Sequence, residues 1–242
     1  MMTERLQKLI ATAGLSSRRE AEKWILAKRV TVNGIVAQLG DKADLSQDQI
    51  MVDGVPLLPP NRRSYVMLHK PPRYVSTLSD EKGRGTVKDL VENFGKRLYP
   101  VGRLDFMSEG LLLMTDDGDL TQKLLHPSHQ VEKEYLLWLR GDVDAALPIL
   151  SATMDLDGDI VEGAKIHIIE QNGDMTKASF VIHQGKNRQL RRMCAQVNLD
   201  VLRLKRIREG TLSLDPKLKK GQWRELTDQE LSCLKKLEAP ES

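Results

Sequence analysis

The first 55 residues show two short helical patterns followed by short extended runs. Apolar residues recur every three or four positions over residues 5–13, which predicts a helix. A second helix is predicted to begin at Ser17, because Ser17 and Glu20 have the spacing of a capping box, and to run to about residue 28. Short strands follow it, and Asn33-Gly34 is typical of a tight hairpin turn between two of them.

The remainder of the chain mixes extended and helical patterns, which predicts an α+β fold. Strands are expected over residues 64–70, 110–115, 134–140, 166–169, 178–182 and 211–214, and helices over residues 86–93, 120–125, 188–197 and 227–237. Three prolines, Pro56, Pro59 and Pro60, separate this region from the N-terminal one, and proline-rich segments act as stiff connectors. We therefore expect a small domain over residues 1–60 and a larger one over residues 61–242.

Composition narrows the class of protein. The chain has 242 residues, of which 40% are hydrophobic and 29% charged, as in ordinary globular proteins. We expect no membrane span, because no run of about 18 apolar residues occurs, and no secretory signal, because the N-terminus lacks an apolar core segment. With only two cysteines, Cys194 and Cys233, a disulfide framework and a cysteine-rich zinc site are excluded. A cytoplasmic monomer without a membrane partner is the expectation.

Charge is distributed unevenly along the chain. The formal net charge is only +3, yet eight basic residues and a single acid, Asp200, fall between residues 186 and 208. Such a basic stripe favours a polyanionic partner, although a solvated surface can have the same composition. Basic residues also cover the first two predicted helices, and Arg18 and Arg19 stand at the positive end of the second, where a bound phosphate would stabilise them. The candidate contacts to a polyanion are Arg5, Arg18, Arg19, Lys28, Arg29, Lys186, Arg188 and Arg192.

The segment over residues 102–118, GRLDFMSEGLLLMTDDG, carries the sharpest candidate chemistry. The carboxylate of Asp105 leads into a loop with the small residues Ser108 and Gly110, and a buried apolar strand is expected to anchor that loop. Loops held by rigid strands are where reactive side chains are commonly placed. By itself, however, Asp105 could equally well cap the backbone amides of a turn.

Two parts of the chain resemble known families. Residues 5–34, RLQKLIATAGLSSRREAEKWILAKRVTVNG, resemble the alpha-L RNA-binding motif of small-subunit ribosomal protein S-four. Residues 102–118 resemble the catalytic motif of pseudouridine synthases, in the branch that acts on ribosomal RNA and carries an alpha-L domain, nearest its large-subunit subgroup. The segments LHKP, KEY, GKNRQLRRM and LKRIREGTLSL, which begin at residues 68, 133, 185 and 204, match further motifs of that family in the same order.

The resemblance implies an enzyme that isomerises a uridine of ribosomal RNA, with large-subunit RNA favoured and DNA not a partner. It implies a larger domain built on a mainly antiparallel sheet. It further implies that Asp105 is the catalytic carboxylate, that the ring of Tyr135 stacks on the target base, and that Arg191 pairs with Asp105. Arg103 and Leu212 are implied to line the pocket, and the listed basic residues to bind RNA.

The implied reaction breaks the bond from ribose to a base nitrogen and forms a bond from ribose to carbon 5 of the base. Because this isomerisation involves no net oxidation and no energy input, we expect no cofactor and no metal. The target base must leave its stack to be reached. Asp105 would then either attack the ribose carbon or remove a neighbouring ribose proton, and the sequence leaves both routes open.

Other interpretations of the same residues are weaker. Asp105 and Glu109 could form a glycosidase pair, but aromatic residues make up only 4% of the chain, which is little for a sugar-binding cleft. The acidic run over residues 155–159 fails the spacing of a calcium loop, and His126 and His129 lack nearby cysteine partners for zinc.

The main alternative to an enzyme is a non-catalytic RNA-binding factor in ribosome assembly. The joint presence of Asp105, Tyr135 and Arg191 argues against it, because a protein that only binds RNA has no need of all three. Glu209 departs from the pattern, since it places an acid where a neutral or basic residue is expected.

Overall fold

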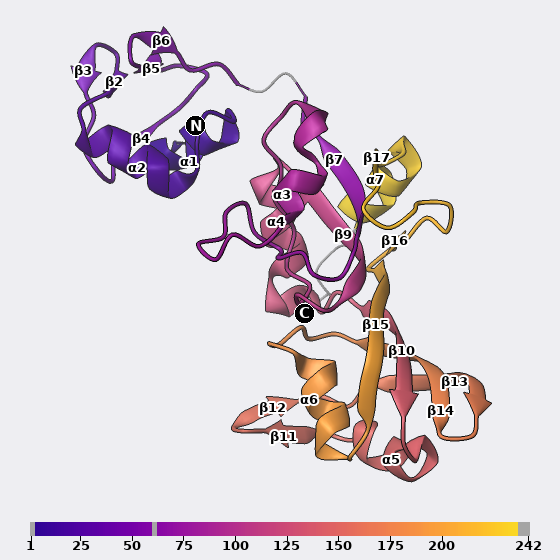
Figure 1. Ribbon diagram of the computed structural model, residues 1–242. Helices are drawn as coiled ribbons and strands as arrows, with labels where there is room; N and C mark the ends of the chain where they lie inside the picture. The colour runs from indigo at the N-terminus through magenta and orange to yellow at the C-terminus, as the bar shows by residue number, and fades with distance from the viewer. Residues whose placement is uncertain (1–2, 60–61, 237–242) are drawn as a thin grey trace. The chain divides into compact units, whose positions relative to one another are not determined.

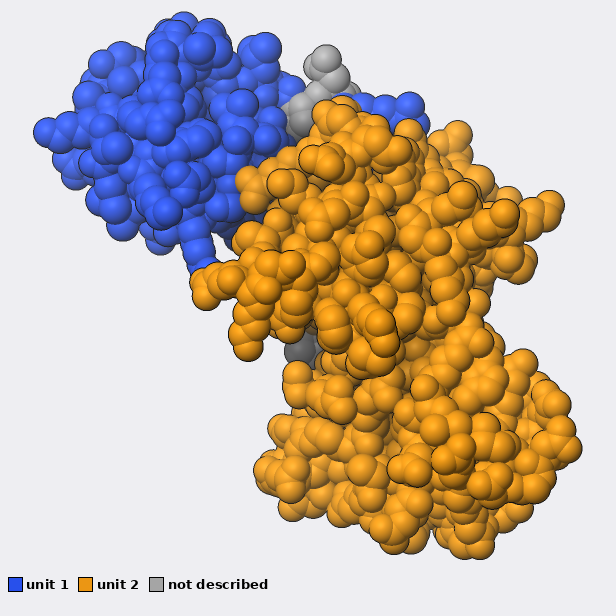
Figure 2. Space-filling view, viewed as in Figure 1, with its two compact units in different colours: residues 1–64, 116–118 blue, residues 65–115, 119–242 orange. Residues whose placement is uncertain are grey.

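The computed structural model describes residues 3–59 and 62–236. Contacts group the chain into two units, one formed by residues 1–64 and 116–118, the other by residues 65–115 and 119–242 (Figure 2). The boundary that the sequence places between residues 60 and 61 falls on residues outside the described ranges.

The N-terminal unit contains two helices and short strands (Figure 1). Its elements are β1 Glu4–Arg5, α1 Leu6–Thr12, α2 Arg18–Leu26, β2 Val30–Val32, β3 Ile35–Val36, β4 Lys42–Ala43, β5 Ile50–Val52 and β6 Val55–Pro56. The Ser17 side chain accepts a hydrogen bond of 3.1 Å from the Glu20 amide, which confirms the predicted N-cap. Asn33 and Gly34 both have positive φ, as the predicted tight hairpin turn requires. The strands form a sheet in the order β3-β2-β5-β6, and β1 pairs with β4.

The larger unit is built on one sheet with helices beside it (Figure 1). Its elements are β7 Tyr65–Lys70, α3 Val87–Leu90, a 3₁₀ segment Glu92–Phe94, β8 Tyr99–Pro100, β9 Glu109–Thr115, α4 Gly118–Leu125, a 3₁₀ segment Pro127–His129, β10 Lys133–Arg140, α5 Val143–Leu150, β11 Met154–Leu156, β12 Asp159–Val161, β13 Lys165–Asn172, β14 Met175–Ile182, α6 Gln189–Gln196, β15 Asp200–Glu209, β16 Leu212–Ser213, β17 Trp223–Glu225 and α7 Asp228–Lys235. No helix within residues 3–59 and 62–236 has the length and apolar character needed to cross a membrane.

The large sheet has nine strands, with β13-β14-β10-β15-β9-β7-β17 in order, β16 beside β15 and β8 beside β9. All of its pairings are antiparallel except that of β9 with β15. The predicted α+β fold with a mainly antiparallel sheet is therefore confirmed. The parallel pairing of β9 with β15 spans only two residue pairs, Lys205 with Glu109 and Arg206 with Gly110. We call this short parallel pairing the seam, because it joins the two halves of the sheet.

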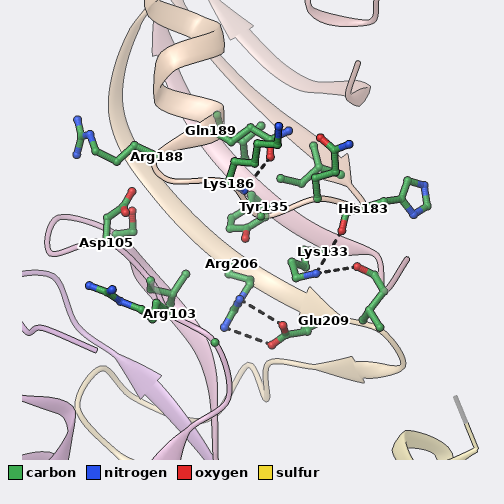
Figure 3. A pocket seen from close by; sticks show the side chains of 18 of the residues that line it. Arg103, Asp105, Lys133, Tyr135, His183, Lys186, Arg188, Gln189, Arg206 and Glu209 are labelled. Carbon is green, nitrogen blue, oxygen red and sulfur yellow. Dashed lines mark hydrogen bonds and ion pairs between the residues drawn. The ribbon is translucent and has the colours of Figure 1, made fainter. Parts of the chain in front are cut away.

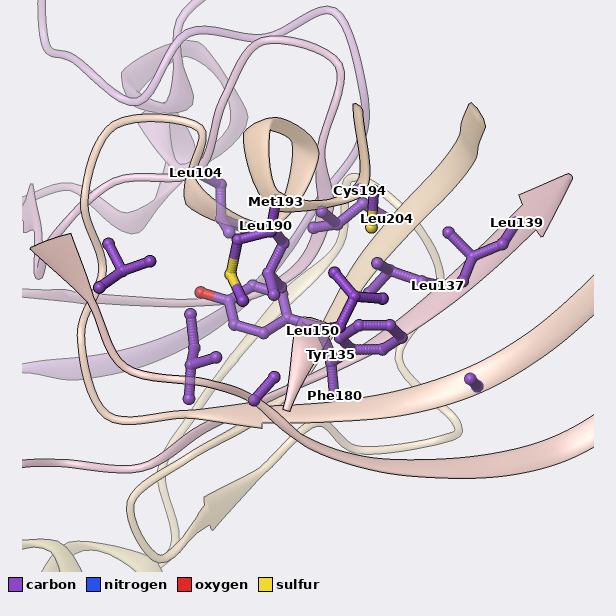
Figure 4. Close-up of a cluster of buried hydrophobic side chains, with 14 of the residues drawn as sticks. Leu104, Tyr135, Leu137, Leu139, Leu150, Phe180, Leu190, Met193, Cys194 and Leu204 are labelled. Atoms are coloured by element: carbon purple, nitrogen blue, oxygen red, sulfur yellow. The ribbon is translucent and has the colours of Figure 1, made fainter. Parts of the chain in front are cut away.

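Apolar packing covers each half of the sheet. On β10, alternate residues such as Tyr135 and Leu137 turn inward and pack with Leu190 and Met193 of α6 and Leu150 of α5 (Figure 4). On β9, successive residues from Leu111 to Met114 alternate between two separate buried clusters. A strand that is buried on both faces reads as a continuous apolar run, which explains why the GLLLMT sequence predicted it so clearly.

Several elements of the larger unit were not expected from the sequence, and the two longest of them are β15 and α5. The ten-residue strand β15 escaped prediction because its buried positions include the charged residues Arg206 and Glu209, which hide the apolar alternation. Helix α5 contains Pro148, and its N-terminus is capped by the Asp142 side chain, which accepts a hydrogen bond of 3.0 Å from the Ala145 amide.

The seam depends on the absence of a side chain at Gly110. Its φ is +112°, in a region that side-chain-bearing residues rarely adopt. A Cβ at this position would overlap the carbonyl oxygen of Arg206 and lie 2.7 Å from the Arg206 nitrogen. Only glycine therefore allows the backbones of β9 and β15 to approach closely enough to pair.

We predict that Gly110→Ala lowers the free energy of unfolding by more than about 3 kcal/mol, because the added methyl group collides with backbone that cannot move aside. Urea denaturation measures the loss. Gly173→Ala is the matched control, since Gly173 also has positive φ but a Cβ there meets nothing within 4 Å, and it should cost about 1–2 kcal/mol. Equal losses in the two variants would contradict the steric account of the seam.

Candidate active site

A cavity of about 490 Å³ lies beside the seam, and residues from distant parts of the sequence line it (Figure 3). Asp105 comes from the loop before β9, Tyr135 is the third residue of β10, and Arg191 belongs to the first turn of α6. The three side chains that the family resemblance singles out are thus brought to one cavity. Arg103 lines the same cavity, as expected.

The backbone that carries Asp105 is held tightly by a buried lysine. The Lys70 ammonium donates hydrogen bonds to the carbonyl oxygens of Asp105 at 3.1 Å, Ser108 at 2.9 Å and Pro71 at 3.1 Å. Burial lowers the pKa of Lys70 to about 8, although the nearby carboxylates of Asp105 and Glu109 oppose the shift. The sequence motif that contains Lys70 pointed to this region, but it gave no sign of this contact.

A second set of contacts fixes the residue before the carboxylate. The Ser76 hydroxyl donates to the Leu104 carbonyl at 2.8 Å and accepts from the Leu104 amide at 3.1 Å. The Ser108 amide closes the loop by donating to the Asp105 carbonyl at 3.0 Å. Within residues 3–59 and 62–236, the Asp105 carboxylate itself makes no hydrogen bond or ion pair, so a rigid loop presents an unengaged carboxylate.

Tyr135 is 8% exposed, and its ring forms part of the cavity wall. Burial raises the pKa of the Tyr135 phenol, and the positive charge of Arg206 opposes that rise only partly. The phenol therefore keeps its proton at neutral pH. An aromatic face in a cavity of this kind is suited to stack on a nucleobase.

Arg191 reaches the cavity but is engaged with the backbone. Its guanidinium donates to the carbonyl oxygens of Val201 at 3.1 Å and Met107 at 3.5 Å. Burial lowers the pKa of Arg191, as does the charge of Arg188, while the charge of Asp105 acts in the opposite direction. No ion pair joins Arg191 to Asp105 in the described part of the chain, so a direct pair between them stays a prediction.

The cavity lining includes charged residues that the sequence did not assign to it, among them Arg206, Glu209 and Lys133. Arg206 and Glu209 are almost fully buried and form an ion pair, with 3.3 Å between the Arg206 Nη2 and the Glu209 Oε2 (Figure 3). Lys133 donates to the carbonyl oxygens of Val131 at 2.9 Å and His183 at 3.3 Å, and burial lowers the pKa of its ammonium. The acid that departs from the expected basic pattern, Glu209, is thus the counter-charge of a buried arginine.

Leu212, which the resemblance places in the pocket, is not among the residues that line this cavity. Leu212 is 2% exposed and packs in the apolar cluster that also contains Leu111 and Leu214, away from the cavity lining. The apolar part of the cavity wall is formed instead by Leu104, Leu124, Val131, Ile182, Leu190 and Leu204.

The basic residues predicted near the cavity fall into two groups. Lys186 and Arg188 line it, and Arg188 is exposed, has the strained φ of +49°, and makes no ion pair among residues 62–236. Lys186 lies 3.5 Å from Asp159 and donates to the Ile160 carbonyl at 2.9 Å. Arg192 points elsewhere, because it pairs with Asp159 at 2.9 Å and does not line the cavity.

The basic residues of the N-terminal unit are likewise divided. Arg29 is held by Asp53 and lies over the Trp24 ring, 4.8 Å from its centroid. Arg5 donates to the Gly40 carbonyl at 3.1 Å. The remaining three are exposed and have no hydrogen bond or ion pair from their side chains to residues 3–59, which leaves them available to a ligand: Arg18, Arg19 and Lys28.

We predict that Lys70 makes the stability of the protein depend on pH. Between pH 8 and 10.5 the unfolded chain binds a proton at Lys70 that the native state has lost, so the stability of the native protein should rise with pH over this interval relative to Lys70→Met. The expected gain is about 2 kcal/mol.

Urea denaturation at pH 7.5 and pH 10 would measure this difference. Lys88→Met, which removes an exposed lysine of α3, controls for the loss of a positive charge. Parallel pH profiles for the wild-type protein and Lys70→Met would contradict a buried ammonium at this site.

Sequence models of two families match the chain. The model of the RNA pseudouridylate synthase family matches residues 64–196, and the model of the S4 domain matches residues 4–57. These matches confirm both resemblances that the sequence motifs indicate.

Similar proteins cover nearly the whole sequence. A protein of Aquifex aeolicus named an uncharacterized RNA pseudouridine synthase is 38% identical over 97% of this chain and 94% of its own length. The ribosomal large subunit pseudouridine synthase B of Bacillus subtilis is 38% identical over 97% of this chain and 96% of its own. A crystal structure of a pseudouridylate synthase matches with a TM-score of 0.67 and 29% identity, over 95% of this chain and 99% of that one. The chain therefore belongs to the RNA pseudouridylate synthase family and carries an N-terminal S4 domain.

Proposed function

We propose that this protein isomerises a uridine to pseudouridine in large-subunit ribosomal RNA. The observation that carries the proposal is the convergence of Asp105, Tyr135 and Arg191 on one cavity. Two relatives with 38% identity, from Bacillus subtilis and Vibrio vulnificus, are named ribosomal large subunit pseudouridine synthase B, which supports the choice of RNA. We further propose that the protein works as a cytoplasmic monomer and does not act on DNA.

The geometry suggests how the substrate is held. A uridine swung out of its stack would place its ring on Tyr135 and its ribose toward Asp105. The Asp105 carboxylate is free to act, either by attacking the ribose carbon that bears the base or by taking a proton from the neighbouring ribose carbon. Arg191 would orient that carboxylate.

The reaction conserves every atom of the nucleotide. The bond between the ribose and nitrogen 1 of the base breaks, the detached base turns within the cavity, and a bond forms from the same ribose carbon to carbon 5. Carbon 5 then loses its proton and nitrogen 1 gains one. The walls of the cavity must therefore hold a detached uracil, and its apolar lining together with the Tyr135 ring is suited to do so.

Free cations around the cavity are suited to the RNA backbone. Arg103 and Arg188 are exposed at the cavity and unpaired among the described residues of the larger unit. In the N-terminal unit, Arg18 and Arg19 begin helix α2, where the backbone amides and the guanidinium groups can bind phosphate together. These groups would supply affinity, whereas the cavity would select the base.

The experiment that tests the proposal incubates the purified protein separately with unmodified large-subunit and small-subunit ribosomal RNA and maps the pseudouridines formed. We expect pseudouridine at a defined position in large-subunit RNA only. Modification of small-subunit RNA alone would overturn the choice of substrate. Tight binding to either RNA without any pseudouridine would favour the non-catalytic assembly factor instead.

We predict that Asp105→Asn lowers kcat for pseudouridine formation by at least about 1,000-fold, because an amide can neither attack ribose nor accept its proton. The isosteric amide should leave the Kd for RNA nearly unchanged. Asp174→Asn, at the exposed turn between β13 and β14, serves as the control and should retain full activity. Substantial turnover by Asp105→Asn would remove this carboxylate from the mechanism.

We predict that replacing Arg18 and Arg19 together with alanine weakens RNA binding and reduces the salt dependence of log Kd by about 1 to 2 units of slope, as expected for two lost phosphate contacts. Binding assays over a range of salt concentrations measure both effects. A double variant of exposed lysines, Lys217→Ala with Lys219→Ala, controls for the change in net charge. An unaltered slope would show that helix α2 does not contact phosphate.

A further inference from the structure

A bulge in β15 places two charged side chains on the same face of the sheet. Tyr135 of β10 pairs with Arg206, but the adjacent Glu134 pairs with Arg208, so Ile207 is an extra residue on β15. Strand residues alternate between faces, so Arg206 and Glu209, three positions apart, would lie on opposite faces of a regular strand. The extra residue brings both to the cavity side, where they pair.

The pair is buried and connected across the seam. Arg206 is 2% exposed and Glu209 is 3% exposed. The Arg206 Nε donates to the Leu111 carbonyl of β9 at 2.8 Å, and its Nη1 lies 3.5 Å from the Glu209 Oε1. Arg206 therefore touches the strand that follows the Asp105 loop and also pairs with the strand that carries Tyr135. Its Nη2 is buried and lies 3.3 Å from the Glu209 Oε2, but it makes no hydrogen bond of good geometry in the described part of the chain.

A buried ion pair of this kind is poor evidence for a purely stabilising role. Removing two charges from water costs several kcal/mol per ion, and well-packed apolar residues often stabilise a protein at least as well. A buried N–H group without a well-aligned hydrogen bond, such as that of the Arg206 Nη2, adds to that cost. A role for Arg206 in the cavity would explain why this ion pair is present although it contributes little to stability.

Arg206 and Tyr135 are partners across the pairing of β15 with β10, and both side chains line the cavity. The phenol oxygen points toward the Arg206 guanidinium (Figure 3), and each of the two side chains influences the pKa of the other. A guanidinium has donors only and no acceptor, so in any hydrogen bond between them the phenol oxygen must accept. The proton of the Tyr135 hydroxyl must then point away from Arg206, toward the open cavity.

We propose that Arg206 is a positioning residue for pseudouridine formation: clamped by Glu209 and the Leu111 carbonyl, it donates to the Tyr135 oxygen and thereby directs the hydroxyl hydrogen at the base in the cavity. The inference rests on the proposed function of the site. Tyr135 would then have two distinct parts, a ring that stacks on uracil and a hydroxyl of fixed orientation that can donate to it.

The test compares Arg206→Lys and Glu209→Gln with wild-type protein. Arg208→Lys is the matched control, because Arg208 is on the same strand and is also paired with carboxylates, those of Glu132 and Glu134, but on the opposite face of the sheet. Thermal unfolding establishes that each variant is folded. The measurements are kcat, KM and the Kd for RNA, together with the NMR signal of the Cζ carbon of Tyr135 in tyrosine-labelled protein without RNA.

We expect Arg206→Lys to lower kcat about tenfold, as the loss of one directing hydrogen bond would, with KM and Kd little changed. Glu209→Gln should act in the same direction but less strongly, since it loosens the clamp without removing the donor. Both variants should shift the NMR signal of the Tyr135 Cζ carbon. Arg208→Lys should leave that signal and kcat unchanged. An unchanged kcat and an unchanged Tyr135 signal in Arg206→Lys would overturn the proposal.

A double-mutant cycle separates positioning from general support of the fold. If Arg206 acts through the hydroxyl, Arg206→Lys should cause no further loss of kcat in a Tyr135→Phe background, whereas a purely structural role would cause the same loss in both backgrounds.

The NMR signal of Tyr135 is measured without RNA and without turnover, so it does not depend on the proposed function. Should the wild-type protein form no pseudouridine, the proposed function would fail while the Arg206–Tyr135 contact could still be judged. If Arg206→Lys does not fold, the test is the Tyr135 Cζ signal of Glu209→Gln: a shift supports the proposal, and an unchanged signal overturns it.

Discussion

The short parallel contact between β9 and β15 is the constraint on which the site depends. Only two residue pairs hold the halves of the sheet together here, and a glycine at position 110 lets the backbones meet. The loop with Asp105 comes just before β9, while Tyr135 lies on β10 next to β15. The same contact that completes the sheet therefore brings a carboxylate and an aromatic ring from distant segments to one cavity.

Buried charges reinforce this contact from both faces. On one face Arg206 spans from β15 to the Leu111 carbonyl. On the other face, the buried carboxylate of Glu109 pairs with Arg203 of β15 and with Lys220, whose Nζ lies 2.6 Å from the Glu109 Oε2. Arg206 and Glu109 give up their hydration, so these contacts contribute specific geometry more than stability. What results is a rigid frame around the Asp105 carboxylate, which makes no hydrogen bond or ion pair with residues 3–59 and 62–236.

The family, the fold class and the convergence of Asp105 with Tyr135 could be predicted from the sequence, because they depend on motifs and on regular periodicity. Arg206 and Glu209 could not, since the bulge at Ile207 changes which residues share a face, and an alternating pattern assigns them to opposite sides. Leu212 packs in a separate apolar cluster and not in the cavity lining, because a motif position does not reveal which buried cluster a side chain joins. The contacts of Lys70 could not be predicted because its three hydrogen-bond acceptors are backbone carbonyls, which every residue has and no sequence pattern identifies.

The most direct measurement of the central claim is a crystal structure of Asp105→Asn bound to a fragment of large-subunit ribosomal RNA that contains the target uridine. The account predicts a uridine turned out of its stack, with its ring against Tyr135 and its ribose next to the amide at position 105. A uridine that remains stacked within the RNA, or one that is bound outside this cavity, would contradict it.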